Sequence, residues 1–429
     1  MTNVRSKYLG LIEAAQQIGN HQLDPKNLIE QSFNLANQVE PQLKAFVSRG
    51  ELEDLKKSIK PGPLSGIPIG IKDIINTVDF VTTNGSPIYA QQLPKQDAPI
   101  VEKIRALGGI IFGKTVTTQF AWKTPGPTVN PWNSEHTPGG SSSGSAAAVA
   151  AGIVPLALGT QTVGSVVRPA AFCGVVGFKP SFGAINKEGV HPLSYSLDHI
   201  GLFTRNLNDA AYAYNLLKNE SAPSINLSAS NEVTPLRQPK IAFIRTPFDS
   251  LMSQEQKQLM ESVVEKLKKA GANLLAIDLP VKYWDGVKQL HIIMAYEAAQ
   301  IHQGHMLNKQ SLLCQNIKEL VSTGLQVSDA QYHTAIATQN QLRKDVAEVF
   351  KGYDALMCAP ATGEAPKGLD STGDPSFCAL GSFLGIPAIN IPAGKSKQGL
   401  PLGIQLMGDY KADDHLLMAS KFIEDSLLA

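Results

Sequence analysis

Residues 137–152 read Thr-Pro-Gly-Gly-Ser-Ser-Ser-Gly-Ser-Ala-Ala-Ala-Val-Ala-Ala-Gly. The glycines and serines predict a loop, and the alanine-rich part that follows predicts a buried helix. Serine hydroxyls and free N–H groups at the start of a helix can bind an anion or stabilise an oxyanion. The alternative is a capped helix behind a flexible loop. The length of this run within apolar sequence disfavours that alternative.

A second polar segment lies a few residues further along the chain. It reads Gly159-Thr-Gln-Thr-Val-Gly-Ser-Val-Val-Arg-Pro169 and follows the apolar run from Ile153 to Leu158. A turn rich in glycine, serine and threonine therefore leaves a buried segment. A purely structural turn is the alternative, but two serine-rich segments that flank one buried helix favour a functional site.

A lysine lies near the end of an apolar segment that reads Gly66-Ile-Pro-Ile-Gly-Ile-Lys-Asp73. In a strand, alternation places Lys72 on the same face as the small residues Pro68 and Gly70. Taken alone, Lys72 is best interpreted as a lysine that reaches solvent at a strand end. However, no His–Asp pair lies near the serines, so a serine nucleophile needs another base. Burial lowers the pKa of a lysine, and Ser–Lys pairs are a known catalytic arrangement.

Two familiar motifs are misleading in this sequence. Residues 108–115 match the phosphate-loop pattern GxxxxGK[ST], but a predicted helix precedes Gly108 and residues 110–112 predict a strand. Strand formation would use the N–H groups that should hold phosphate. Residues 140–144 match the nucleophile elbow GxSxG with Ser142 at its centre, but no apolar strand leads into them. Neither a nucleotide site nor an α/β-hydrolase is expected.

Composition narrows the class of protein. The 429 residues include 38 Lys and Arg against 37 Asp and Glu, and 43% of them are hydrophobic. We expect a large core and no direct nucleic acid partner, because no broad positive field is available. The four cysteines form no CxxC pair, which disfavours a zinc site or a disulfide framework. The first residues lack an apolar signal core, and the longest apolar stretch is too short to span a bilayer. A soluble cytoplasmic protein with no membrane partner is expected.

The order of predicted elements indicates an α/β protein. The first sixty residues predict a helical N-terminal arm, and short strands then alternate with helices. Residues 241–279 predict a strand, a capped amphipathic helix and a second strand, which is a βαβ unit. Residues 284–350 are mostly helical in character, and residues 386–392 and 402–407 predict two core strands.

These segments resemble the amidase signature family. The family motifs GGSSGGSAAA, GTDTGGS and PAAFCGVVGLKP have close matches in Gly139–Ala148, Gly159–Ser165 and Pro169–Pro180. The resemblance extends to the strand that carries the family's lysine and to Leu384–Pro392 and Leu400–Leu406. It is weakest from about 220 to 345, a more variable and mainly helical region. It implies a single large α/β/α domain over residues 1–429, with a central mixed, twisted sheet flanked by helices.

Carried over position by position, the family's Ser–cis-Ser–Lys triad falls on Ser165, Ser141 and Lys72. The resemblance implies that Ser165 is the nucleophile, that Ser141 relays its proton, and that neutral Lys72 is the base. It also implies an oxyanion hole made by the backbone N–H groups of Thr162, Val163, Gly164 and Ser165. No metal or organic cofactor is implied.

The sequence departs from the family pattern at several positions. Gln161 replaces the usual aspartate, and Val163 and Ser143 replace glycines. Val167 occupies the place of the usual arginine, and Arg168 follows one position late. These changes leave the triad intact and bear on how the loop is held and which substrates fit.

Three functions compete. The leading hypothesis is an amidase that hydrolyses the carbon–nitrogen bond of a small amide or urea-type substrate to an acid and ammonia or an amine, through an acyl-enzyme on Ser165. The alternative is the glutamine-hydrolysing A subunit of a tRNA-dependent amidotransferase, which usually keeps the aspartate and arginine replaced here by Gln161 and Val167. A non-catalytic paralogue is disfavoured by the intact triad.

Substrate contacts are expected from the positions that line the pocket in relatives. They are Gln119, Phe120, Trp122, Ser142 and Asp374. An ordinary core role for Phe120 and Trp122, and a turn at Asp374, are equally good interpretations. The expected partners are a small amide or urea-type molecule and, from relatives, a second copy of the chain in a homodimer.

Overall fold

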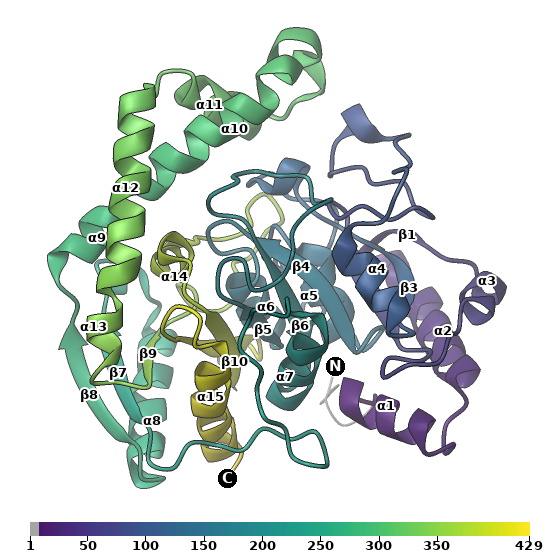
Figure 1. The fold of residues 1–429 in the computed structure, drawn as a ribbon, viewed down its shortest axis with the longest axis horizontal. Coiled ribbons are helices and arrows are strands. Elements are labelled where there is room, and N and C mark those ends of the chain that lie inside the picture. The colour runs from purple at the N-terminus through teal and green to yellow at the C-terminus, as the bar shows by residue number, and fades with distance from the viewer. Residues whose placement is uncertain (1–7) are drawn as a thin grey trace.

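In the computed structural model, which describes residues 8–429, the short apolar runs form one mixed sheet (Figure 1). Within those residues the sheet has eleven strands. In spatial order they are β1 (Phe46–Arg49), β3 (Ile110–Thr115), β2 (Pro68–Lys72), β4 (Leu156–Gln161), β6 (His199–Thr204), β5 (Val176–Lys179), β10 (Ala388–Lys395), β11 (Pro401–Met407), β9 (Ala355–Cys358), β7 (Lys240–Arg245) and β8 (Asn273–Asp278). This arrangement confirms the α/β fold with a central mixed sheet.

Strand direction follows the connections. Strand β2 runs parallel to β3 and β4, and β7 runs parallel to β8 and β9. The other neighbouring pairs are antiparallel. Parallel neighbours on both sides bury β2 completely, so its whole length lies in the core.

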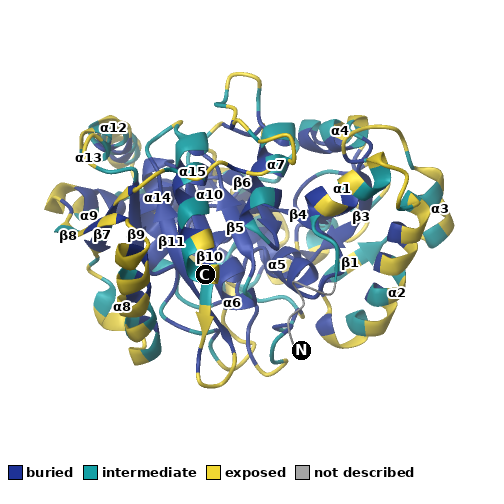
Figure 2. Cartoon of the chain, turned by 90° about the horizontal axis from the view of Figure 1, so that it is seen from below, coloured by how far each residue is buried: buried dark blue, intermediate teal, exposed yellow. Residues whose placement is uncertain are grey.

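Helices cover both faces of the sheet. They are α1 (Leu11–Gly19), α2 (Pro25–Leu43), α3 (Leu52–Lys57), α4 (Pro99–Ala106), α5 (Ser143–Ala150), α6 (Val167–Cys173), α7 (Leu207–Leu217), α8 (Gln254–Lys269), α9 (Val281–Val287), α10 (Gln289–Asn308), α11 (Gln315–Gly324), α12 (Asp329–Asp345), α13 (Ala347–Phe350), α14 (Ala379–Leu384) and α15 (Asp413–Leu428). Helices α4, α7, α8 and α15 share one apolar cluster with the sheet, and α5, α6 and α14 pack on the opposite face. Figure 2 shows the central strands as a buried layer between partly exposed helices, whereas the edge strands β1 and β8 are partly exposed.

The helical region near the middle of the chain forms a projection. Helices α10, α11 and α12 rise beyond one end of the sheet (Figure 1), and α10 packs against both α11 and α12. The predicted βαβ unit is present as β7, α8 and β8, with Ser253 capping α8 through the N–H of Gln256 at 3.2 Å. Within residues 8–429, no helix is long and apolar enough to cross a membrane.

The N-terminal arm differs from expectation in one element. Its described part contains α1, α2 and α3, but residues 46–49 form β1, which pairs antiparallel with β3 at the edge of the sheet. Pairing with the free edge of β3 overrides the helical character of the surrounding sequence. Residues 1–7 of the expected arm lie outside the described residues.

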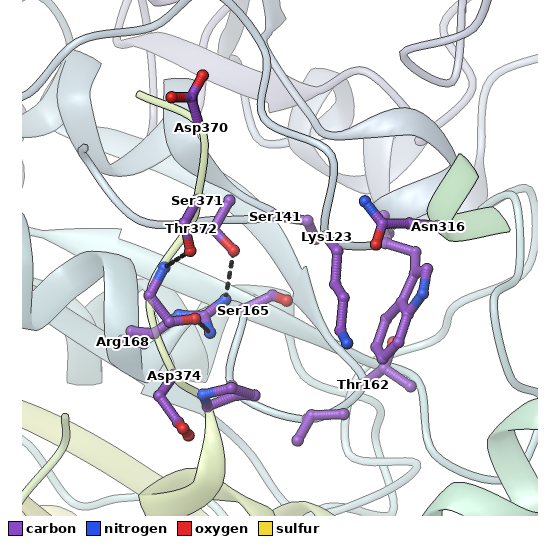
Figure 3. A pocket seen from close by; sticks show the side chains of 16 residues that line it. Lys123, Ser141, Thr162, Ser165, Arg168, Asn316, Asp370, Ser371, Thr372 and Asp374 are labelled. Carbon is purple, nitrogen blue, oxygen red and sulfur yellow. Dashed lines mark hydrogen bonds between the residues drawn. The ribbon is translucent and has the colours of Figure 1, made fainter. Parts of the chain in front are cut away.

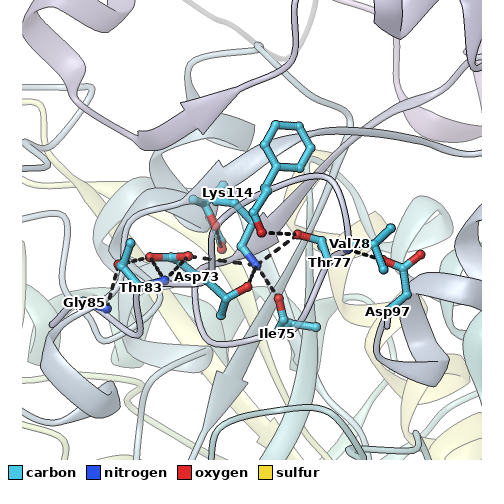
Figure 4. A network of polar contacts seen from close by, with 12 residues as sticks. Asp73, Ile75, Thr77, Val78, Thr83, Gly85, Asp97 and Lys114 are labelled. Carbon is cyan, nitrogen blue, oxygen red and sulfur yellow. Dashed lines mark hydrogen bonds and ion pairs between the residues drawn. The ribbon is translucent and has the colours of Figure 1, made fainter. Parts of the chain in front are cut away.

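The segment that resembles a phosphate loop is a strand, as predicted. Lys114 lies in β3 and is fully buried, and Gly108 follows α4 with a φ of +87°. The ammonium of Lys114 donates to the Ile75 carbonyl and to Thr82 Oγ1 at 2.8 Å, and lies 3.9 Å from the Asp73 carboxylate. Figure 4 shows Lys114 among Asp73, Ile75 and Thr77. Lys114 therefore joins loops inside the protein, and burial lowers its pKa to about 8.

Close approach of α5 to the sheet depends on one glycine. A Cβ atom at Gly144 would lie 2.1 Å from the Ala45 carbonyl oxygen and 2.3 Å from the Val116 nitrogen. Both are backbone atoms, which cannot rotate away. The glycine in the quoted loop therefore sets how near the start of α5 can come to β3.

We expect Gly144→Ala to lower the free energy of unfolding by about 1–3 kcal/mol, the usual cost of overpacking. Gly304→Ala is the matched control, because Gly304 lies in α10 with open space around its Cβ position. Alanine there should stabilise the helix by about 0.5–1 kcal/mol. Chemical denaturation measures both, and a Gly144→Ala protein as stable as the wild type would contradict the packing argument.

Candidate active site

Lys72 is buried at the end of β2 and reaches toward the serine-rich loop. Its Nζ donates to Ser141 Oγ at 2.7 Å and to Thr160 Oγ1 at 2.7 Å. Strand alternation puts Lys72 on the face that α5 covers, beside Gly70, as the sequence predicts. The structure therefore brings Lys72 and Ser141 together from positions 69 residues apart.

Burial sets the charge state of this lysine. Desolvation in the core holds the pKa of Lys72 well below its usual value, and the nearby Asp198 carboxylate opposes this lowering. Asp198 itself accepts hydrogen bonds from Thr162 Oγ1 at 2.6 Å and from two backbone N–H groups. Because an ammonium without its hydration shell is costly, burial favours the neutral amine of Lys72 more than water would.

The peptide bond between Gly140 and Ser141 is cis. Arg168 holds this loop, because its guanidinium donates to the Gly140 carbonyl at 2.7 Å and to the Gly373 carbonyl at 2.6 Å. It also donates to Thr372 Oγ1 at 3.2 Å. The arginine that comes one position late in the motif thus ties the loop before α5 to a segment more than 200 residues away.

Residues 162–165 form a turn between β4 and α6. Among residues 8–429, no group accepts a hydrogen bond from the backbone N–H groups of Thr162, Val163, Gly164 or Ser165. The next two N–H groups, of Val166 and Val167, both donate to Gln161 Oε1, at 2.8 and 3.0 Å. The turn therefore presents a set of unoccupied donors beside the Ser165 side chain.

Gln161 braces this turn from inside the core. Its Nε2 donates to Ser382 Oγ at 2.9 Å, and Ser382 Oγ donates to the Val163 carbonyl at 2.6 Å. The Gln161 amide, which stands in place of an aspartate, therefore bonds through both of its polar atoms. Its oxygen caps α6, and its nitrogen connects the turn to α14. A neutral side chain thus caps this helix.

A cavity of about 410 Å³ opens beside the turn (Figure 3). Its walls come from five parts of the chain: residues 121–123, the serine-rich loop, the turn with Arg168, Asn316 of α11, and residues 370–375. The lining residues are Ala121, Trp122, Lys123, Ser141, Thr162, Val163, Gly164, Ser165, Arg168, Asn316, Asp370, Ser371, Thr372, Gly373, Asp374 and Pro375. Ser141, Ser165 and the four N–H groups thus face one space.

Of the expected substrate contacts, Trp122 and Asp374 line this cavity. Gln119 does not, because its side-chain amide is bonded to Ser86 Oγ, the Leu312 carbonyl and the Cys314 N–H. Phe120 is buried among histidine rings on the far side of the same segment. Ser142 is also buried, since its hydroxyl bonds to the backbone of Thr160. Gln119, Phe120 and Ser142 therefore lie outside this cavity, and their contact with substrate stays a prediction.

Other residues of the site are missed by sequence reasoning. Thr160 supplies the second oxygen for Lys72, and its position inside the glycine- and threonine-rich motif is the available signal. Lys123 and Asn316 reach the cavity because α11 docks near residues 119–124, which no local pattern indicates. Within residues 8–429, no group of three or more His, Cys, Asp or Glu side chains is placed to hold a metal ion.

Comparisons with known proteins agree with this geometry. The family model described as Amidase matches residues 28–417. The A subunit of the Glutamyl-tRNA(Gln) amidotransferase of Halothermothrix orenii is 32% identical over 98% of this chain and 97% of that protein.

Two solved structures extend the likeness. The A subunit of the Glutamyl-tRNA(Gln) amidotransferase of Thermotoga maritima has a TM-score of 0.83 at 27% identity, over 99% of this chain and 96% of that chain. A peptide amidase from Stenotrophomonas maltophilia has a TM-score of 0.85 at 25% identity, over 100% of this chain and 98% of that chain. The chain belongs to the amidase signature family, and it is an amidohydrolase of that family.

The same comparisons correct the expected partners. The sequence suggested a small amide or urea-type substrate and a homodimer, with no other macromolecule. Several of the similar proteins, however, are by name subunits of an amidotransferase. A set of partners restricted to a small molecule and a second copy of this chain is therefore wrong.

Gln161→Leu removes the acceptor of two buried N–H groups and the donor to Ser382. We expect it to lower the free energy of unfolding by about 2 kcal/mol or more, because unsatisfied buried groups cost about 1–3 kcal/mol each. The exposed Gln91 offers a matched control, and Gln91→Leu should change stability by less than about 0.5 kcal/mol. Equal stability of the two variants in chemical denaturation would show that the brace is dispensable.

Proposed function

We propose that this chain hydrolyses the side-chain amide of glutamine and releases ammonia as the catalytic subunit of an amidotransferase-type complex. The observation that carries the chemistry is the Lys72 Nζ at 2.7 Å from Ser141 Oγ, beside a cavity that also contains Ser165. The glutamine substrate and the partner subunits are inferred from the amidotransferase A subunits to which the chain is similar over nearly its whole length.

In the proposed mechanism, Ser165 attacks the amide carbonyl carbon while its proton passes to Ser141 and the proton of Ser141 passes to neutral Lys72. The carbonyl oxygen becomes an oxyanion, which the backbone N–H groups of residues 162–165 stabilise. Support for this role is that these four donors have no other acceptor among the described residues. Each such donor contributes on the order of a hundredfold or more in rate.

Collapse of the tetrahedral intermediate breaks the carbon–nitrogen bond. The proton held on Lys72 returns through Ser141 to the leaving nitrogen, and ammonia departs. Ser165 is left as an ester, the acyl-enzyme. Water then attacks this ester with the same proton relay, releasing glutamate and restoring the serine.

A second candidate is an amidase that acts on another small amide or urea-type substrate. The departures at Gln161 and Val167 favour it, because amidotransferase A subunits usually carry an aspartate and an arginine at these positions. The likeness to a peptide amidase also supports it. The same hydrolytic groups would serve both reactions.

An ammonia-release screen distinguishes the two. Purified chain incubated separately with glutamine, simple primary amides and ureas should release ammonia from glutamine, and Ser165→Ala should abolish this release. A fluorophosphonate probe should label the wild type and not Ser165→Ala, with the exposed Ser262→Ala as a labelled and active control. Ammonia from ureas or other amides, with none from glutamine, would establish the second candidate instead.

The pH dependence should report Lys72. Because burial lowers the pKa of Lys72 and the base must be neutral, kcat/KM should be low at acid pH and rise to a plateau as the amine loses its proton. Lys72→Arg should be inactive at every pH, since guanidinium stays charged.

Another buried lysine provides the control for this profile. Lys179 lies outside the cavity, and burial lowers its pKa to about 7. Folded Lys179→Met protein should show the same fall in kcat/KM at acid pH as the wild type. If this fall is absent in that variant, or if kcat/KM of the wild type increases on acidification, the assignment to Lys72 is contradicted.

A further inference from the structure

Two cations line the cavity, Arg168 and Lys123. The terminal nitrogens of Arg168 donate to the Gly140 and Gly373 carbonyls and to Thr372 Oγ1, while its Nε is buried without a partner. Lys123 is exposed and forms no ion pair with any acid among residues 8–429. Its ammonium lies 5.0 Å from the centre of the Trp122 ring. Figure 3 shows the Lys123 side chain directed into the cavity, between Asn316 and Ser165 in that view.

The segment that carries Lys123 is held firmly by the helical projection. Gln119 Nε2 donates to the Leu312 carbonyl at 2.9 Å, and Gln119 Oε1 accepts from the Cys314 N–H at 2.7 Å. On the other side of Lys123, Asn316 Nδ2 donates to Thr124 Oγ1 at 2.9 Å. These bonds fix the segment on both sides of the lysine.

The backbone between these anchors is unusual. Phe120, Ala121 and Lys123 have φ values of 50°, 60° and 38°, in the left-handed region that residues with side chains seldom occupy. Such conformations persist where surrounding contacts enforce them, and they concentrate at binding and catalytic sites. Here they turn Trp122 and Lys123 toward the cavity.

The acidic residues of the cavity do not neutralise this lysine. Asp374 Oδ1 accepts from the Ser376 N–H at 2.7 Å, and Asp370 is exposed on the opposite rim. Neither carboxylate forms an ion pair with Lys123 within 4.0 Å. A carboxylate on the substrate is the group that complements an ammonium placed in this way.

We propose that Lys123 is a specificity-determining residue that binds a carboxylate on the acyl part of the substrate. The preferred substrates are then monoamides of dicarboxylic acids, a class that includes glutamine, in preference to neutral amides of the same length. This inference rests on the proposed function and adds to it the residue that selects the substrate.

Steady-state kinetics with matched substrates test the proposal. Glutaramate and glutamine carry the carboxylate, and butanamide is the neutral amide of similar length. Lys123→Met should raise KM for the two carboxylates about tenfold or more, with kcat little changed and with no change for butanamide, because a charge-assisted hydrogen bond is lost. Lys123→Arg should largely restore KM. Lys266→Met, which removes an exposed charge on α8, should behave as the wild type.

Reversal of the charge at residue 123 provides a second, independent test. Lys123→Glu should favour 4-aminobutanamide over glutaramate, the reverse of the wild type. Unchanged KM values for glutaramate and glutamine in Lys123→Met, with hydrolysis intact, would overturn the role of Lys123 while leaving the proposed function in place.

Direct binding separates the two proposals if no amide is hydrolysed. Calorimetric titration with glutarate, the product dicarboxylate, compares Ser165→Ala with Ser165→Ala/Lys123→Met. Binding weakened about tenfold or more by the second substitution supports the carboxylate site even if the proposed function fails. Equal affinity of the two proteins, or no binding to either, would overturn it.

Discussion

The geometry of the site depends on the burial of one amine, that of Lys72. Lys72 lies at the end of a strand with parallel neighbours on both sides, and its amine is held by the hydroxyls of Ser141 and Thr160. A lysine in such a place is stable as a neutral base with hydrogen-bond partners, and costly as an ion. Those partners come from the loop before α5 and from the end of β4, which brings two separate segments to one amine.

Two side chains hold the loops around the cavity in position. Arg168 binds the carbonyls of Gly140 and Gly373, and Gln161 caps α6 while connecting through Ser382 to Val163. Both bind backbone groups, and in this way they hold the loops that carry the serines and the N–H donors. Two of the departures from the family pattern, Gln161 and the displaced Arg168, thus fall on residues that support the site.

The motifs bring Lys72, Ser141 and Ser165 to one region of the structure, and their catalytic roles stay predictions. These motifs are local, and strand alternation alone places Lys72 beside Gly70. The sequence does not predict the walls of the cavity: the Gln119 amide bonds to backbone near residues 312–314, a contact that depends on how the helical projection docks. Strand β1 is missed for a similar reason, since four residues with little pattern of their own become a strand by pairing with β3.

The long-range bonds of Arg168 and Ser382 bear on how the protein is made. The loop that carries Ser141 and the turn at residues 162–165 are translated early, but the residues that support them, Gly373 through Arg168 and Ser382 through Val163, come more than 200 residues later. The hydrogen-bond partners of Lys72, by contrast, are Ser141 and Thr160, which belong to the first half of the chain. The residues that surround the buried amine are therefore translated long before those that hold the loops of the cavity in place.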